Sequence, residues 1–289
     1  MAHEPTPSGA TSVVGSPGAI DPELVARINA RQWFHTIDLG RGVVTPGAPV
    51  NAVLEQPGAF PDMRGRTVLD IGAWDGKHSF RAEQAGASRV VALDHYVWQV
   101  DFVARMHYWA ECEAAGRLPD PSYDGFLDPV NTPGKEGFDL ARQALGSGVE
   151  AVVGDFMTMD LAPIGTFDVV LFLGVLYHLV NPLGALQRIR QLTDGVAVIE
   201  TEAVLVPGHP AQHLLSFYPG KELNGDHTNW FAPTEATLHA MCRAAGFARV
   251  ETAAMTELTK PSLWKRVQSR MSRELAVPVG YRIVVHAST

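Results

Sequence analysis

A short turn between two apolar segments carries residue types suited to binding a ligand. It spans residues 70–76 (DIGAWDG), follows an apolar run, and contains Gly72 and Gly76. Because glycine has no Cβ, the backbone of such a turn can approach a ligand and present its N–H groups. A second apolar run ends at Asp94, 18 residues after Gly76. An acid there is suited to accept hydrogen bonds from ribose hydroxyls, so the pair predicts a nucleotide-like cofactor.

The residues around the two glycines favour one cofactor class. A dinucleotide fingerprint has the form G-x-G-x-x-G, whose glycines make room for a pyrophosphate. Here the bulky Trp74 and the anionic Asp75 lie between the glycines, which argues against a pyrophosphate. Asp70, just before the turn, is placed to accept from a ligand ammonium group. We therefore expect S-adenosylmethionine (SAM), and a NAD-dependent dehydrogenase is the least favoured alternative.

Other candidate cofactor contacts follow the remaining apolar runs. Asp155 is placed to accept from the adenine amino group, and Phe156 to pack on the ring. Tyr177 is a candidate because aromatic faces attract sulfonium cations. Arg41 is a candidate partner for the methionine carboxylate. Three further candidate contacts are Trp74 within the glycine turn, His95 directly after Asp94, and Leu173.

Methyl transfer to a hydroxyl group needs a base as well as positioning. His178 is the first candidate, because it follows an apolar run at the expected mouth of the site. Glu200 and Glu202 come next. His35 and His227 would enter from an N-terminal segment and from a late loop.

A metal ion is a weaker hypothesis. His209 and His213 have the spacing of helical ligands, but Pro210 interrupts a helix there, which argues against structural zinc. A magnesium ion that orients sugar hydroxyls would need oxygen ligands. Three carboxylates are candidates, Glu200, Glu202 and Asp226.

Apolar and helical segments alternate along the chain. Strands are predicted over residues 67–71, 89–93, 149–153, 167–173, 195–201, 247–254 and 281–285. Helices are predicted over residues 22–33, 77–85, 97–115, 182–191 and 234–245, the first capped by Asp21. Near-continuous apolar strands alternating with helices indicate an α/β, Rossmann-like fold, with a mostly parallel sheet covered on both faces.

The segments outside this alternation predict the domain organisation. Residues 1–18 are predicted to be a flexible tail, and residues 19–60 a lid segment. A cofactor-binding domain then covers residues 61–289, with insertions at about 117–140 and 202–231 that supply the acceptor site.

Composition limits the partners and the compartment. The chain has 289 residues and a net charge of −8, so no general attraction to nucleic acid is expected. Its two cysteines suit a reducing cytosol. The longest apolar run, residues 169–177, is too short to span a bilayer, so a cytoplasmic protein is expected.

The same motifs carry a family resemblance. Residues 70–76 resemble motif I of class I SAM-dependent methyltransferases, although Ala73 and Trp74 depart from its usual G-x-G-x-G. Residues 174–179 (GVLYHL), followed by Asn181-Pro182-Leu183, resemble the segment after strand four of tRNA wobble-uridine carboxymethyltransferases. Residues 33–39 and Glu200-Thr201 also resemble that group. The resemblance implies seven strands closed by an antiparallel hairpin.

The resemblance also orders the functional hypotheses. The tRNA enzymes have a larger, more basic N-terminal part, and we find no convincing set of basic residues here for their carboxylated SAM derivative. Ordinary SAM and a small acceptor are therefore favoured. Within the group the chain is similar to actinobacterial enzymes that methylate mannosides, which implies sugar O-methylation, as in polysaccharide biosynthesis. The alternatives are a tRNA-modifying transferase, a methyltransferase of secondary metabolism and a SAM-binding module without catalysis.

Overall fold

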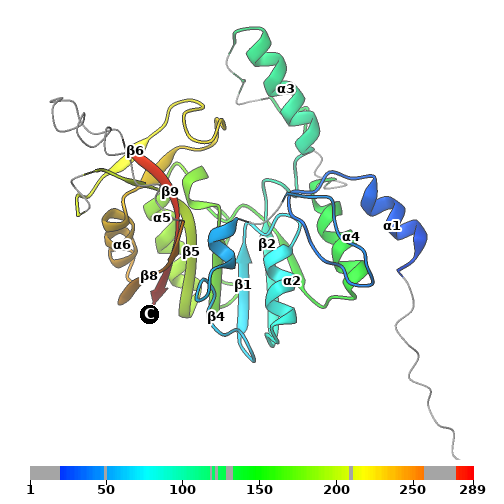
Figure 1. Ribbon diagram of the computed structural model, residues 1–289, viewed down its shortest axis with the longest axis horizontal. Coiled ribbons are helices and arrows are strands. Elements are labelled where there is room, and N and C mark those ends of the chain that lie inside the picture. The colour runs from blue at the N-terminus through cyan, green and yellow to red at the C-terminus, as the bar shows by residue number, and fades with distance from the viewer. Residues whose placement is uncertain are drawn as a thin grey trace, which may run out of the picture.

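A central sheet of seven strands organises the molecule, in the order β3-β2-β1-β4-β5-β9-β8 (Figure 1). The computed structural model describes residues 20–48, 51–117, 119–120, 123–127, 133–207, 211–256 and 278–289. The strands are β1 (Thr67–Ile71), β2 (Arg89–Asp94), β3 (Glu150–Val153), β4 (Phe167–Leu173), β5 (Thr193–Leu205), β8 (Arg249–Met255) and β9 (Val279–Ser288). The pairs among β1 to β5 are parallel, whereas β9 is antiparallel to both β5 and β8. The predicted fold class and the closing antiparallel hairpin are confirmed.

The register brings the carboxyl ends of the parallel strands to one edge. Ile71 pairs with Leu93 of β2 and Phe172 of β4, and Leu173 pairs with Glu200 of β5. Ligands of open α/β sheets bind outside this edge. The turn after β1, the acid after β2 and the segment after β4 therefore lie close together.

Helices cover both faces of the sheet. Helices α1 (Pro22–Asn29), α2 (Lys77–Gln84) and α4 (Glu136–Leu145) share one buried cluster with Val68 and Leu171. Helices α5 (Pro182–Leu192) and α6 (Glu235–Ala244) share the other with Leu69 and Val170. Successive strand residues point to opposite faces, so each strand is buried on both sides and reads as a continuous apolar run.

Most differences from the predicted elements lie at helices. The cap of α1 is confirmed, with the Asp21 carboxylate accepting from the Glu23 N–H at 3.0 Å, but α1 ends at Asn29. Helix α3 (Phe102–Ala114) begins later than predicted, because Asp101 caps it through the Ala104 N–H. Helix α4 was not predicted, since its first residues lie in a segment rich in proline and glycine.

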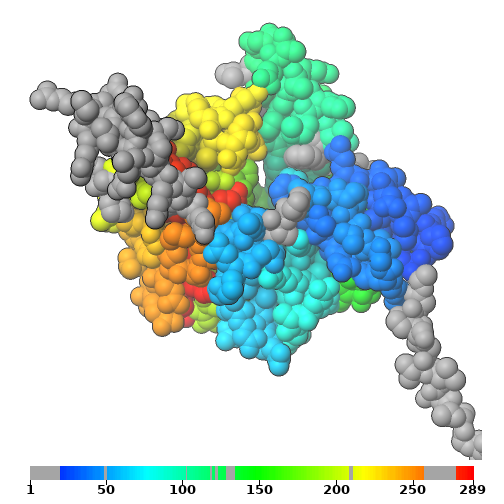
Figure 2. Space-filling view, in the orientation of Figure 1, coloured from blue at the N-terminus to red at the C-terminus, as the bar shows by residue number. Residues whose placement is uncertain are grey.

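Two segments stand beyond the carboxyl edge of the sheet. Helix α3 projects from the body, and a small sheet of β6 (Leu215–Phe217) and β7 (Phe231–Pro233) lies on the same side (Figure 1). Figure 2 shows a hollow that opens between α3 and the yellow residues of this second segment. Strand β6 belongs to the predicted insertion at 202–231, whereas α3 is the helix predicted over residues 97–115. The predicted tail, residues 1–18, lies outside the described residues.

Three short 3-10 turns complete the described part, η1 (Ala52–Glu55), η2 (Pro133–Lys135) and η3 (Leu176–His178). Over the ranges that the structure describes, no helix combines the length and apolar character needed to cross a membrane.

Candidate functional site

The turn after β1 is bent so that it packs against the segment after β4. Gly72 has a φ of +79°, and a Cβ on it would lie 2.4 Å from a methyl group of Val175. Gly76 has a φ of +85°. Even Trp74 has a positive φ, +50°, which a bulky residue rarely adopts. The two glycines are therefore required by backbone conformation, and also by the close approach of Val175 to Gly72 and of Phe138 to Gly76.

Asp94 lies at the end of β2, beside this turn. It is 5% exposed, and its two carboxylate oxygens accept from the backbone N–H groups of Trp74 at 2.9 Å and Val97 at 3.3 Å. Each carboxylate oxygen has a further lone pair for a ligand hydroxyl. Burial raises the pKa of Asp94 to about 6. The neighbouring His95 is half-buried.

Asp70 is placed differently. Its carboxylate is buried and accepts from the Ser79 hydroxyl at 2.6 Å, which ties β1 to α2. Burial raises its pKa to about 6, although the Ser79 hydrogen bond opposes the shift. The structure thus gives Asp70 a partner inside the protein, where the sequence predicted a ligand ammonium group.

Asp75 anchors the N-terminal segment. Its Oδ2 accepts from the backbone N–H groups of Phe34 at 3.0 Å and His35 at 2.8 Å, and its Oδ1 pairs with the His35 ring. Asp75 is 3% exposed. The sequence analysis expected the charge of Asp75 to repel a pyrophosphate. That reason is wrong, because the carboxylate is turned away from a ligand and bonds to Phe34 and His35. His35 is likewise held by Asp75, through Nδ1, and its role as a base stays a prediction.

The rest of the N-terminal segment follows this anchor. The Trp74 ring stacks on Phe34, with centroids 4.2 Å apart, and the Lys77 ammonium donates to the Thr36 carbonyl at 2.7 Å. Residues 33–48 thus lie against the glycine turn. Arg41 is exposed at the tip of a tight turn within them, with a φ of +53°.

Asp155 and Phe156, after β3, are largely engaged in local structure. The Asp155 carboxylate accepts from the Met157 N–H at 2.8 Å and the Thr158 hydroxyl at 2.9 Å. The Phe156 ring is buried against Phe172 in the core, which leaves little of it for an adenine ring.

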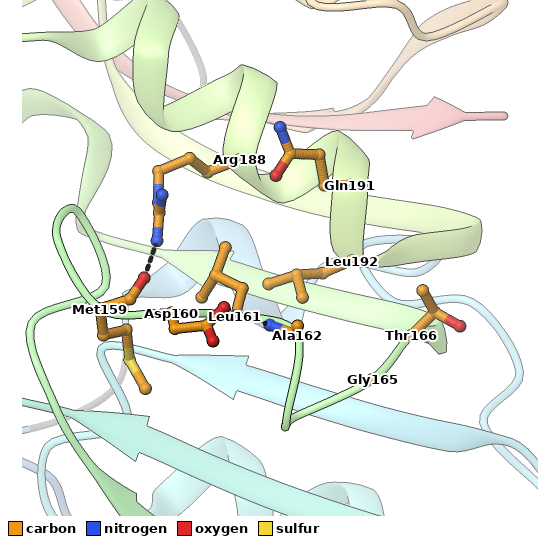
Figure 3. Close-up of a pocket in the computed structure, with 9 residues that line it drawn as sticks. All are labelled: Met159, Asp160, Leu161, Ala162, Gly165, Thr166, Arg188, Gln191 and Leu192. Atoms are coloured by element: carbon orange, nitrogen blue, oxygen red, sulfur yellow. Dashed lines mark hydrogen bonds between the residues drawn. The ribbon is translucent and has the colours of Figure 1, made fainter.

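A groove beside this segment lies under α5. Arg188 of α5 donates to the carbonyl oxygens of Phe156 and Met159, and Figure 3 shows it reaching across the groove to the loop of residues 159–166. The groove extends to Thr166, at the amino end of β4, away from the glycine turn. It is therefore separate from the predicted site.

Arg282 of β9 holds both glutamates of the predicted base set. Its guanidinium donates to Glu200 through Nε at 2.5 Å and Nη2 at 3.0 Å, and to Glu202 through Nη1 at 2.7 Å. Nη2 also donates to the Tyr177 hydroxyl at 3.3 Å. Burial opposes the charge of Arg282, but its bonds with Glu200 outweigh this and raise its pKa. Asn51 donates to Glu200 as well, at 2.8 Å.

Glu200 and Glu202 are thus paired carboxylates, so a role for either as a free base is not supported. The predicted magnesium site is not supported either. Within the described ranges, no group of three or more His, Cys, Asp and Glu side chains is arranged to hold a metal ion. His209 lies outside the described residues.

His178 is arranged as a neutral base. Its Nδ1 lies 3.2 Å from the carbonyl oxygen and 2.9 Å from the Oγ1 of Thr228, and that hydroxyl donates to Asp226 at 2.8 Å. A carbonyl oxygen only accepts, so Nδ1 carries the proton and Nε2 keeps its lone pair. Burial lowers the pKa of His178, which keeps the ring neutral near pH 7.

Comparison with known proteins assigns the chain to a family. The family described as a methyltransferase domain matches residues 51–252. The chain belongs to this methyltransferase domain family. Its sheet order and closing hairpin are those of the class I fold, and the prediction of a SAM-dependent methyltransferase domain, with SAM as cofactor, is confirmed.

The curated relatives are tRNA enzymes that match only in part. The tRNA U34 carboxymethyltransferase of Shewanella loihica is 30% identical over 197 residues, which cover 68% of this chain and 47% of that protein. The enzyme of the same name from Shewanella putrefaciens is 29% identical, over 65% of this chain and 45% of its own. The chain thus spans about half the length of the curated relatives it matches.

A solved structure matches over nearly the whole chain. The N-terminal domain of EvdMO1, crystallised in the presence of S-adenosylhomocysteine (SAH) and D-fucose, has a TM-score of 0.55. The match covers 92% of this chain and 94% of that one, at 16% identity. At this identity the likeness establishes the fold alone.

Within the methyltransferase domain, the structure separates the predicted residues into two groups. Gly72, Gly76 and Asp94 form one group around the turn. His178 and Tyr177 lie in the segment after β4, where the Tyr177 carbonyl accepts from the Trp230 N–H at 2.8 Å. The remaining predicted contact, Leu173, ends β4.

His227 is a neighbour of this second group, but it is not one of the residues that bond from His178 through Thr228 to Asp226. Its ring centroid lies 6.3 Å from that of Trp109 on α3. Sequence reasoning missed Thr228 and Arg282. Only Arg282 had a local signal, as a lone basic residue within the last apolar strand.

Proposed function

We propose that this methyltransferase transfers a methyl group from SAM to a hydroxyl group of a small acceptor, with a sugar as the favoured class. The observation that carries the proposal is the relay from His178 through Thr228 to Asp226, while no described residue bonds to Nε2 of His178. A neutral imidazole with a free lone pair is the group that removes a hydroxyl proton near pH 7.

The residues around the glycine turn fit the proposed cofactor. Gly72 has a positive φ and no side chain, so the backbone of the turn is open to a ligand beside Asp94. The Asp94 carboxylate has remaining lone pairs at the end of β2, suited to two neighbouring ribose hydroxyls. Among the predicted contacts, these residues have the strongest support.

The proposed reaction is an in-line displacement with a proton transfer. SAM, when bound, supplies a methyl group on a sulfonium sulfur. His178 Nε2 takes the proton of the acceptor hydroxyl while its oxygen bonds to the methyl carbon and the carbon–sulfur bond breaks. The products are a methyl ether, SAH and an imidazolium, whose Nδ1–H still donates to Thr228. Asp226, bonded to the Thr228 hydroxyl, favours that positive charge.

A sugar acceptor has independent support. The N-terminal domain of EvdMO1, which shares this fold, was crystallised in the presence of SAH and D-fucose. The sequence resemblance to mannoside methyltransferases points the same way. Acceptors from secondary metabolism remain within the proposal, since they also offer hydroxyl groups.

We further propose the domain roles. Residues 19–60 act as a lid, supported by the anchor that Asp75 makes with His35 and by the bond from Asn51 to Glu200. The insertions at 117–140 and 202–231 bound the acceptor site, since the second of them supplies Thr228.

Modification of tRNA is the second candidate, because the curated relatives are named tRNA U34 carboxymethyltransferases. The net charge of −8 argues against it, since nucleic-acid binding rests largely on basic side chains that neutralise phosphates.

The experiment that tests the proposal is an acceptor screen with methyl-labelled SAM across sugars, phenols and tRNA. We expect label in sugars as a methyl ether, lost when the acceptor hydroxyl is replaced by hydrogen. Label in tRNA alone, with binding that weakens steeply as salt rises, would overturn the proposal in favour of the second candidate.

A further inference from the structure

Arg105 of α3 is a buried cation held between two aromatic rings. Its guanidinium carbon lies 3.8 Å from the ring centroid of Tyr96 and 4.1 Å from that of Trp109. The residue is 5% exposed, although α3 projects from the body. These two contacts restrict the position of the guanidinium, whose N–H groups act only as donors.

No described residue accepts a hydrogen bond from the guanidinium of Arg105 or forms an ion pair with it, unlike the guanidinium of Arg282. The nearest acid in electrostatic terms, Asp226, already accepts from the backbone N–H and hydroxyl of Thr228. Burial lowers the pKa of Arg105 to about 10, so the group is still charged at pH 7. A buried cation without a partner is costly, and it marks a position where a ligand can supply the missing acceptors.

Arg105 lies between the glycine-turn group with Asp94 and the group around His178 and Thr228. Tyr96 comes two residues after Asp94, the acid beside the glycine turn. On the other side, the Trp109 ring lies 6.3 Å from that of His227, the residue before Thr228. The charge of Arg105 also acts on His178, whose pKa it helps to lower. In Figure 2, α3 borders the hollow beyond the sheet edge.

We propose that Arg105 binds an oxyanion of the acceptor, a phosphate or a carboxylate, so that the acceptor is an acidic sugar rather than a neutral one. Such groups match the guanidinium edge with two parallel hydrogen bonds. This inference rests on the proposed function, since it names the acceptor class of the same site.

The test is calorimetric titration of the full chain, saturated with SAH, with glucose, glucose 1-phosphate, glucose 6-phosphate and glucuronate. We expect at least one acidic sugar to bind about tenfold or more tightly than glucose, as for a charge-assisted bidentate pair. The phosphates and the uronate distinguish the two sources of the oxyanion. Equal affinity for glucose and all three acidic sugars would overturn the inference.

The variants assign the preference to Arg105. Arg105→Met keeps an unbranched stem between the rings and removes the charge, so it should abolish the preference while SAH affinity is unchanged. Arg105→Lys keeps the charge without the planar edge and should lose most of the preference. Arg117→Met is the matched control, because Arg117 also stacks on a tyrosine ring, 5.4 Å from the centroid of Tyr108, but is exposed. A preference that survives in Arg105→Met contradicts the inference.

Two outcomes separate this inference from the proposed function. Binding is read without turnover, so a chain that prefers acidic sugars but methylates none of them refutes only the hydroxyl-transfer proposal. Methylation of neutral sugars, unaffected by Arg105→Met and Arg105→Lys, refutes only the inference. Where Arg105→Met fails to bind SAH and so has not folded, the Arg105→Lys titration decides. Binding of tRNA alone, weakened by Arg105→Lys, would also reject a small acidic acceptor.

Discussion

Asp94 and His178 are tuned by the same physical cause, burial, which disfavours the charged form of each side chain. Burial raises the pKa of Asp94 to about 6 and lowers the pKa of His178. Near pH 7, Asp94 is therefore mostly an ionised acceptor and His178 a neutral base. These are the protonation states that cofactor binding and proton removal require.

The raised pKa of Asp94 predicts how cofactor binding depends on pH. An ionised carboxylate accepts from ribose hydroxyls, whereas a protonated carboxyl has lost part of that capacity. We expect the Kd for SAH to be constant above about pH 7 and to rise by up to about tenfold per unit below about pH 6. Calorimetry across this range measures it.

Asp94→Asn is the control, because it removes the titrating group. It should bind SAH more weakly at every pH and show a flatter dependence between about pH 5 and pH 7. A wild-type Kd that stays constant down to pH 5 would contradict the role of Asp94.

At the scale of the elements, Asp75 holds the N-terminal segment of residues 33–48 against the glycine turn, a role that the sequence did not predict. Asp75 accepts from two backbone N–H groups and pairs with the His35 ring. Asp75 itself belongs to the glycine turn, but His35 lies 40 residues away in the sequence. The strand and turn were readable from local patterns, but such a long-range contact was not.

Replacing Asp75 should therefore release the segment. Asp75→Ala leaves the Phe34 and His35 N–H groups without their carboxylate, and we expect a loss of about 2–4 kcal/mol in the free energy of unfolding. Hydrogen exchange of residues 33–48 should accelerate. Asp38→Ala is the control, because that exposed carboxylate accepts only from the Gly40 N–H in the same turn. Unchanged exchange in Asp75→Ala would show that the segment is held by other contacts.

Strands β5 and β9 are joined at the site by a buried ion pair. Glu200 is 1% exposed, and Arg282 is its bidentate partner. Arg282→Met should cost about 3–5 kcal/mol of unfolding free energy, because it leaves a buried carboxylate uncompensated. Urea denaturation of the variant measures this loss.

A second substitution tests the cause of that loss. In Arg282→Met with Glu200→Gln, no buried charge is left unpaired at position 200, so part of the stability should return. If the double variant is less stable than either single variant, the ion pair is not the source of the effect.

For the whole molecule, a mostly parallel sheet with a common carboxyl edge follows from apolar runs that are buried on both faces, whereas the closing antiparallel hairpin was implied only by the family resemblance. Those runs placed β1 and β4 to the residue, and they predicted the glycine turn and Asp94 together. The sequence did not predict α4, whose start reads as loop, nor the partners of Glu200 and Asp75. These partners come from segments far along the chain, and no local period records them.

The proton-accepting relay is likewise assembled only by the complete fold. His178 follows β4, while Thr228 and Asp226 come from the insertion before β7, 50 residues later for Thr228. The chain is a methyltransferase domain in which, we propose, the sheet supplies the cofactor turn and the insertion at 202–231 completes the base. That assembly is the central claim of this account.

The most direct test of that claim is the kcat of His178→Ala with saturating SAM and a sugar acceptor identified in the screen. We expect kcat to fall by about 10²–10⁴-fold, with the Kd for SAH unchanged, because a general base contributes about that factor. His239→Ala, on α6, is the control and should keep its activity. Full turnover by His178→Ala would contradict the account.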